Sequence, residues 1–141
     1  MPLVMKLLIV AMALQVLLAV IILVLMGRER VPRVMSGEIA AKDIAVERTA
    51  YPLRARLLSN SFDNQFQLPV LFYAVLLLAL WSGGTNWFEV VLAWGFVALR
   101  YVHALIHTTS NNLIPRFAVY TSGLAVLCLL WLLVLLRILL A

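Results

Sequence analysis

The strongest constraint on the fold is the presence of four apolar runs, each long enough to cross a lipid bilayer. The first covers residues 7–26 and is interrupted only by Gln15. A helix rises about 1.5 Å per residue, so about 20 apolar residues span the roughly 30 Å of hydrocarbon in a bilayer. The other three runs cover residues 62–81, 87–106 and 117–140. We therefore predict an all-α fold, an integral membrane four-helix bundle that forms a single transmembrane domain over residues 1–141.

The composition agrees with a membrane protein. Hydrophobic residues make up 65% of the 141-residue chain and charged residues 12%, against about 45–50% and about 25% in soluble domains. A soluble globule of this size has too much surface to bury that share of apolar side chains. The net charge of +5 might suggest a nucleic-acid partner, but Lys and Arg are not interleaved with aromatic residues. The P-loop, GxGxxG, GxSxG and CxxC motifs of soluble enzymes do not occur in the sequence.

The first run could be a signal peptide instead of a retained span. The apolar region of a signal peptide is about 7–15 residues long and is followed by a small-residue cleavage site. Here the run is longer and ends in Gly27-Arg28-Glu29-Arg30. We therefore expect a retained span.

The distribution of charge between the runs predicts the orientation of the protein. Residues 27–57 contain seven basic and four acidic residues, whereas residues 82–86 contain no Lys or Arg and are flanked by Trp81 and Trp87. Cytoplasmic connections of membrane proteins are enriched in Lys and Arg, and Trp is enriched at the interfaces. We expect residues 27–57 and 107–116 to face the cytoplasm and both termini to face the other side. The short loops favour a multi-pass protein of a bacterial inner membrane.

Several polar side chains lie within or beside the predicted spans, where they are costly and therefore candidates for function. Those of the second span recur at steps of three and four residues and share one helix face: Arg56, Asn60, Asp63, Asn64 and Gln67. Those of the third span are Arg100, His103 and His107. Arg100 would lie about 9 Å short of the cytoplasmic boundary, and its side chain could reach Asp63. Such an ion pair could be a structural contact or part of a binding site.

The start of the fourth span suits an anion. Pro115 is well suited to the first position of a helix, which would place Arg116 in the first turn and Tyr120 one turn further on the same face. The free amides of a helix start and a guanidinium both attract negative charge.

Structural roles remain open for the same residues. Asn60, Asn64 and Gln67 could form hydrogen bonds between helices, and Arg54, Arg56 and Arg116 could anchor lipid headgroups. Tyr120 could simply pack. His103 and His107 have the spacing of a metal site, but a metal needs a third ligand, and the chain has no HExxH motif and no other histidine. We predict no metal site.

Two stretches of the chain resemble a known family. The first runs from Arg56 to Pro69. The second comprises Arg100-Tyr101-Val102-His103, His107, Ile114-Pro115-Arg116-Phe117 and Tyr120. With the four-span layout, they are similar over residues 48–125 to the membrane-associated proteins in eicosanoid and glutathione metabolism (the MAPEG family). This family includes microsomal glutathione transferases, leukotriene C4 synthase and microsomal prostaglandin E synthase, and the last shows a similar Arg, His, Arg, Tyr order.

The first stretch fits the family pattern in two registers. The pattern is an Arg, an Asn four residues on and a Glu three further, with a Pro close behind. In one register Arg56, Asn60 and Asp63 fill these places. In the other register Asn60, Asn64 and Gln67 fill them, with Pro69 where the proline belongs. Both registers stay open at this point.

The resemblance implies a homotrimer that binds glutathione as cosubstrate between subunits, near the cytoplasmic surface. In the first register Arg56, Asn60 and Asp63 would hold the backbone and charged ends of glutathione. The full predicted binding set is Arg56, Asn60, Asp63, Asn64, Gln67, Arg100, His103 and His107. Arg116, which matches the arginine assigned to stabilising the thiolate, and Tyr120 are the predicted catalytic residues. His107 departs from the family, which commonly has a tyrosine there.

We therefore expect a membrane-bound glutathione transferase or peroxidase-like enzyme that acts on a lipophilic electrophile or hydroperoxide. The alternative is a non-catalytic member of the family, serving as an accessory or structural subunit of a larger membrane complex. A transporter or channel is disfavoured because the polar residues of the spans gather at one end of the bundle. The expected partners are a second and third copy of the chain, the bilayer and a lipophilic small molecule, with no nucleic acid.

Overall fold

The computed structural model describes residues 1–140, and every regular element in this part of the chain is helical. The elements are α1 (Leu3–Met35), η1 (Ala41–Ile44), α2 (Leu53–Asp63), η2 (Asn64–Phe66), α3 (Leu68–Ser82), α4 (Trp87–Thr108) and α5 (Leu113–Leu139). Four helical stretches are long and apolar enough to cross a membrane, with α2 and α3 together forming the second. The prediction of an all-α membrane bundle is confirmed.

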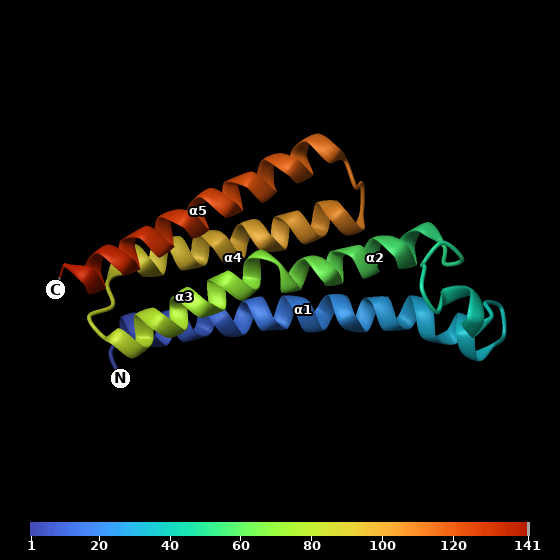
Figure 1. Ribbon diagram of the computed structural model, residues 1–141, viewed down its shortest axis with the longest axis horizontal. Coiled ribbons are helices and arrows are strands. Elements are labelled where there is room, and N and C mark those ends of the chain that lie inside the picture. Colours follow the sequence, from blue (N-terminus) through green and yellow to red (C-terminus); the bar gives the residue numbers. More distant parts are fainter. Residues whose placement is uncertain (141) are drawn as a thin grey trace.

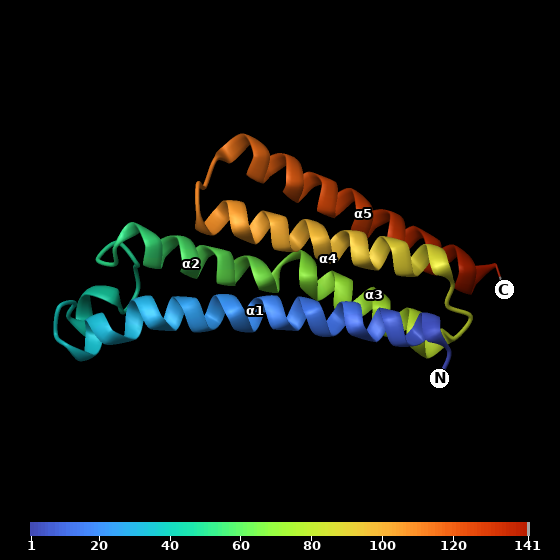
Figure 2. The ribbon, with the colours of Figure 1, turned by 180° about the vertical axis from the view of Figure 1, so that it is seen from behind.

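The helices run side by side as an elongated bundle, with α1 along one edge of the view, α2 and α3 end to end, and α5 along the opposite edge (Figures 1 and 2). Helix α4 packs directly against α1, where Trp94 Nε1 donates to the Leu7 carbonyl at 3.2 Å and the Tyr101 hydroxyl donates to the Leu14 carbonyl at 2.8 Å, and it also packs against α5. Both termini and the α3–α4 connection lie at one end, which we call the terminal end. The α1–α2 and α4–α5 connections lie toward the other end, which we call the connection end (Figure 1). This arrangement brings the two polar connections of the chain to the same end of the bundle.

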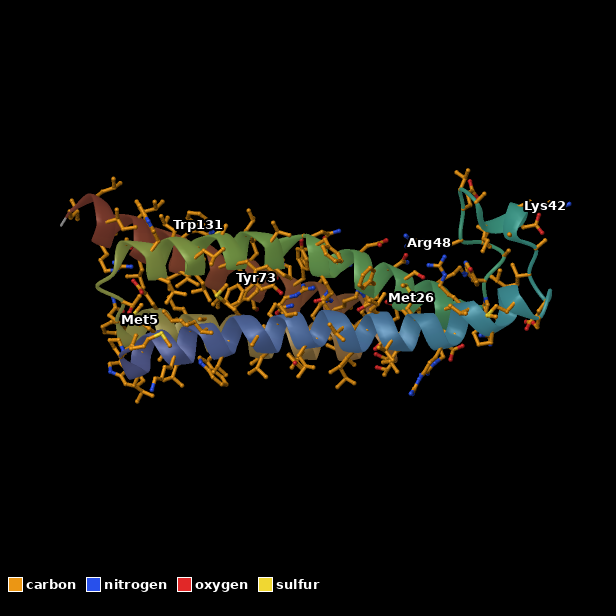
Figure 3. All side chains as sticks on the ribbon, turned by 90° about the horizontal axis from the view of Figure 1, so that it is seen from below. Met5, Met26, Lys42, Arg48, Tyr73 and Trp131 are labelled. Atoms are coloured by element: carbon orange, nitrogen blue, oxygen red, sulfur yellow. The ribbon has the colours of Figure 1, made fainter. Side chains whose placement is uncertain are left out.

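Helix α1 continues nine residues beyond its predicted apolar run, from residue 26 to Met35. Charge pairs support the extension: Arg33 Nη1 lies 2.9 Å from Glu29 Oε2, one helical turn away, and Arg54 Nε of α2 lies 3.1 Å from Glu29 Oε1. The polar segment is therefore partly helical, and its irregular part is confined to residues 36–52 apart from η1. Lys42 and Arg48 mark this part of the connection end in Figure 3.

The second span is interrupted in the middle. Helix α2 ends at Asp63, a short 3₁₀ turn follows, and α3 begins at Leu68 with Pro69 in its first turn. Proline has no backbone N–H and its ring clashes with the preceding turn, so it favours a break before it. Pro69 therefore accounts for the break in the second span. At the break, the Asn64 carbonyl accepts two hydrogen bonds, from the Gln67 backbone N–H at 3.4 Å and from Arg100 Nη2 at 3.1 Å.

Apolar packing between the helices fills the terminal half of the bundle. Phe72 of α3 stacks on Phe96 of α4, with ring centroids 4.6 Å apart, and both side chains are fully buried. Many other apolar side chains are exposed on the outer faces of α1 and α5, as expected of surfaces that contact lipid. Near the middle, Gln15 of α1 donates to Gln65 Oε1 at 3.0 Å, and this buried bond joins the first span to the break in the second.

Helices α4 and α5 are tied together at the terminal end. Arg137 Nε lies 2.7 Å from Glu89 Oε1, and the Glu89 side chain is fully buried. Asn86 caps α4 by accepting from the Glu89 backbone N–H at 3.1 Å. Toward the connection end, the first turns of α5 lie farther from α4 than its last turns do (Figures 1 and 2).

Candidate functional site

A cavity of about 440 Å³ lies between α2, α4 and the first turns of α5. We call it the polar cavity. It is lined by Asn60, Asn64, Gln67, His103, His107, Leu113, Arg116, Phe117 and Tyr120. Seven of the ten predicted site residues therefore line one space, and Arg56, Asp63 and Arg100 do not.

The break in the second span forms the amide wall of the polar cavity, which consists of Asn60, Asn64 and Gln67. Asn60 and Asn64 lie one turn apart, and Asn64 Nδ2 donates to the Asn60 carbonyl at 3.1 Å. Gln67 occupies the residue between η2 and α3 and is exposed. These residues are the three of the second register, whereas Asn60 is the only residue of the first register in the lining.

Helix α4 contributes two histidines to the opposite wall. His103 and His107 are one turn apart, both are buried, and their ring centroids lie 5.6 Å from one another. The His103 ring also lies 5.7 Å from the ring of Tyr120 on α5. Neither Nδ1 atom forms a hydrogen bond with residues 1–140. The lining of the polar cavity therefore contains two largely buried imidazole rings beside a phenol, and their Nδ1 atoms are buried.

Arg116 supplies the positive charge of the lining. Its Nη1 donates to Asn111 Oδ1 in the α4–α5 connection. Asn111 has a backbone φ of 49°, in the left-handed region, which Asn adopts more readily than most residues. Sequence reasoning missed Asn111 as a partner of Arg116. The only signal was its place in the polar run Thr108 to Asn112, which is typical of a turn.

The predicted start of the fourth span at Pro115 is wrong, because α5 begins at Leu113. Asn112 caps the helix: its Oδ1 accepts from the Ile114 N–H at 3.3 Å, and its carbonyl accepts from the Arg116 N–H at 3.2 Å. Pro115 has no N–H to offer. Most amides of the first turn are therefore engaged or missing, so the guanidinium of Arg116, more than free amides, makes this wall attractive to anions.

Arg100 lies behind the lining and is only 1% exposed. Its single hydrogen bond within residues 1–140 goes from Nη2 to the Asn64 carbonyl, and Nε and Nη1 have no partner there. A buried guanidinium without a carboxylate is costly. Its positive charge adds to that of Arg116 on the same side of the bundle.

The predicted pair between Arg100 and Asp63 is wrong. Asp63 lies at the last position of α2 and its side chain is half exposed, with Arg48 Nη1 2.6 Å from Oδ2 and Arg48 Nη2 3.3 Å from Oδ1. These bonds raise the pKa of Arg48 above its usual value. The reason for the error is that the α1–α2 connection folds back over α2 and supplies a closer cation. Arg56 is also outside the lining, and its buried Nε has no partner among residues 1–140.

Four helices able to span a bilayer, with a polar cavity toward one end, define a multi-pass membrane protein with a polar site among its helices. A model of the MAPEG family matches residues 8–136, and the chain belongs to this family. The match extends beyond the two stretches that suggested the family and reaches into all four spans. No curated protein and no solved structure matches the chain.

Proposed function

We propose that the protein is a membrane-bound glutathione transferase or peroxidase-like enzyme that holds glutathione as its thiolate in the polar cavity. The observation that carries this proposal is the convergence of Arg116, His103 and Tyr120 on one cavity, opposite the amide wall. The family to which the chain belongs includes glutathione transferases, which supports glutathione as the cosubstrate.

The charge of the site supports an anionic ligand. Arg116 lies in the lining and Arg100 lies directly behind it, and no carboxylate is among the lining residues. Glutathione carries two carboxylates and a thiol that ionises. Its negative groups would compensate the two guanidiniums, and the amide wall would donate hydrogen bonds to its peptide carbonyls. Of the two registers, this geometry favours the one that uses Asn60, Asn64 and Gln67.

In the proposed mechanism, Arg116 activates the sulfur. A free thiol has a pKa near 8.5, so only a few per cent is thiolate at neutral pH. A neighbouring guanidinium favours the anion and lowers that pKa. The thiolate attacks an electrophilic carbon, forms the C–S bond and displaces the leaving group with its electron pair. With a hydroperoxide it attacks the outer oxygen, giving an alcohol and a sulfenic acid that a second glutathione reduces to the disulfide and water. The Tyr120 hydroxyl, which belongs to the same lining, would donate a hydrogen bond to the sulfur or the leaving group.

The edge of the polar cavity suits a lipophilic second substrate. Leu113 and Phe117 are part of the lining and are 66% and 64% exposed. Both lie at the start of α5, which faces outward from the bundle. A molecule dissolved in the bilayer would meet this apolar margin before it reached the sulfur, and binding both reactants together supplies the proximity term of catalysis.

The proposal is tested with purified protein in lipid nanodiscs, supplied with glutathione and either a lipophilic aryl halide or a lipid hydroperoxide. Formation of the conjugate, or of glutathione disulfide with the alcohol, is the expected result, with Arg116→Ala strongly impaired. Arg28→Ala is the matched control, because Arg28 is an exposed cation of α1 outside the cavity. No product with any electrophile, and no glutathione binding, would contradict the proposal.

An accessory, non-catalytic subunit is the second candidate. The specific observation in its favour is that the amide wall is uncharged, since Gln67 stands where the family pattern has a Glu. Stable co-purification with another membrane protein, without glutathione binding, would favour this candidate over the enzyme.

We also propose that the protein assembles as a homotrimer, with its connection end toward the cytoplasm. Residues 27–57 carry seven of the eleven Lys and Arg residues, which supports that orientation. The mass of the detergent-solubilised complex and the labelling of single cysteines in the two connections test these statements.

A further inference from the structure

A second cavity, of about 450 Å³, lies along the last turns of α1, where the α1–α2 connection folds against the helix. We call it the interfacial groove. One face of α1 from Leu23 to Met35 lines it, together with Ile44 and Tyr51 of the connection. Within residues 1–140, it shares no lining residue with the polar cavity. Met26, which belongs to this lining, is labelled on α1 in Figure 3.

Arg30 supplies positive charge to the interfacial groove and is held in place by its neighbours. Its Cζ atom lies 4.6 Å from the centroid of the Tyr51 ring, a cation–π contact. Tyr51 is itself buried in a small apolar cluster with Ile39 and Ala55, so the ring is a fixed support. Such a contact leaves N–H donors of the guanidinium available to a ligand.

The depth of Arg30 matches the phosphates of a bilayer. The apolar run of the first span ends at residue 26, and Arg30 follows four residues later, about 6 Å further along the helix. The headgroup layer on each side of the hydrocarbon is about 5–8 Å thick. Leu23 and Met26, at the other end of the groove, therefore lie at the depth of the acyl chains.

The charge around the groove favours an anion. Residues 27–57 contain seven basic and four acidic residues. Two of these acids are engaged by other arginines: Glu29 by Arg33 and Arg54, and Glu38 by Arg33. Basic clusters beside a membrane span attract lipids with anionic headgroups. A phospholipid also carries its acyl chains directly below its charge, as the groove requires.

We propose that the interfacial groove binds one anionic phospholipid per subunit, with the phosphate on Arg30 and an acyl chain along Leu23 and Met26. Every lining residue comes from one chain, so each subunit of an assembly brings its own groove. The site is separate from the polar cavity and does not depend on glutathione binding. A neighbouring subunit is the competing occupant, which the tests below distinguish from a lipid.

The first test measures lipid retention by native mass spectrometry, in mixed micelles that contain phosphatidylglycerol and phosphatidylcholine with the same acyl chains. We expect at least about tenfold preference for phosphatidylglycerol, because hydrogen bonds to charged groups are strong. Arg30→Met should lose most of this preference. Arg28→Met is the matched control, since it removes the same charge from an exposed residue of α1 outside the groove. No preference in the wild-type protein, or an equal loss in both variants, would overturn the proposal.

The second test fills the groove and keeps its charge. A Cβ atom added at Gly27, which is part of the lining, meets no atom within 4 Å. We therefore expect Gly27→Leu to fold and to retain about tenfold less phosphatidylglycerol. Gly95→Leu on α4 is the matched control, because Gly95 is equally open and lies outside the groove. Normal retention in Gly27→Leu would overturn the proposal.

The same experiments distinguish the other occupants. The mass spectra give the number of subunits, and a change in that number in Arg30→Met with an unchanged lipid preference would assign the groove to a contact between subunits. Phosphatidylglycerol should raise the melting temperature of the protein in phosphatidylcholine micelles, whereas glycerol phosphate, which has no acyl chains, should not. An equal rise with glycerol phosphate would contradict a lipid site, because the apolar part of the groove would then be unused.

Discussion

Arg48 holds Asp63 through two hydrogen bonds, from Nη1 to Oδ2 at 2.6 Å and from Nη2 to Oδ1 at 3.3 Å. The pair directs the only acid of α2 toward the α1–α2 connection and away from the polar cavity. The face of the second span that meets the cavity is therefore built from neutral amides. This relationship separates the two registers of the family pattern, because Asp63 belongs to one and Gln67 to the other.

The first prediction concerns this pair. We expect Asp63→Asn to lower the free energy of unfolding by less than about 1 kcal/mol, because both partners are substantially exposed and such pairs contribute little. Glutathione affinity should not change. Asn64→Leu, which removes an amide from the lining, should weaken glutathione binding about tenfold. Calorimetry on both variants measures the affinities. Weaker binding in Asp63→Asn with normal binding in Asn64→Leu would support the first register instead.

The second prediction concerns Asn111, which accepts a hydrogen bond from Arg116 while its backbone adopts a left-handed conformation. Glycine tolerates this conformation without strain, so Asn111→Gly should keep the turn and the thermal stability. It should lower kcat by allowing the guanidinium to move, with KM much less affected. Asn111→Asp keeps an acceptor for Arg116 and is the matched variant, in which most of the activity should return. Full activity in Asn111→Gly would show that Arg116 needs no support from this residue.

The third prediction concerns Arg100, which is buried and forms a single hydrogen bond within the described residues 1–140. Replacing a buried charge with an apolar side chain of similar length is often neutral or stabilising. We expect Arg100→Met to leave the melting temperature of the ligand-free protein unchanged or raised, and to reduce the further rise that glutathione produces. That rise depends on affinity. A large loss of ligand-free stability with a normal response to glutathione would identify Arg100 as a structural residue only.

The fourth prediction concerns the buried hydrogen bond between Gln15 and Gln65, at 3.0 Å. Gln15→Leu leaves the Gln65 carbonyl oxygen without this donor, and we expect a loss of about 1–2 kcal/mol. The double change Gln15→Leu with Gln65→Leu removes both polar groups and should recover part of that loss. Unfolding in mixed micelles measures three variants: Gln15→Leu, Gln65→Leu and the double change. If the double variant is less stable than either single variant, the bond is not the source of the effect.

The spans could be predicted because bilayer thickness sets a minimum helix length, and each apolar run reaches it. The break before Pro69 was also predictable, because a proline lacks the backbone N–H that the helix needs at that position. Residues spaced three or four apart, such as Asn60 with Asn64 or His103 with His107, lie on one helix face wherever the helix goes. These local regularities were enough to predict most of the residues that line the polar cavity.

The errors arose where two local signals competed or where a partner came from outside the helices. Asn112 and Pro115 are both good residues for a helix start, and Asn112 prevailed because its side chain caps Ile114 while Pro115 is tolerated within the first turn. Two arginines, Arg48 and Arg100, contact the end of the α2–η2 segment, and whether Asp63 pairs with Arg48 depends on the path of the α1–α2 connection. Spacing along one helix carries no information about that path.

The most direct test of the central claim is the ultraviolet absorbance of the glutathione thiolate, measured against pH in the presence of the protein. We predict a saturable thiolate signal at neutral pH, with a midpoint at least about one unit below the free thiol pKa near 8.5. In Arg116→Ala the thiolate signal should be largely lost at neutral pH and should reappear only as the pH approaches the ordinary thiol pKa. In Arg28→Ala the signal should be unchanged. No thiolate signal at millimolar glutathione, or the same midpoint in Arg116→Ala as in the wild-type protein, would contradict the account.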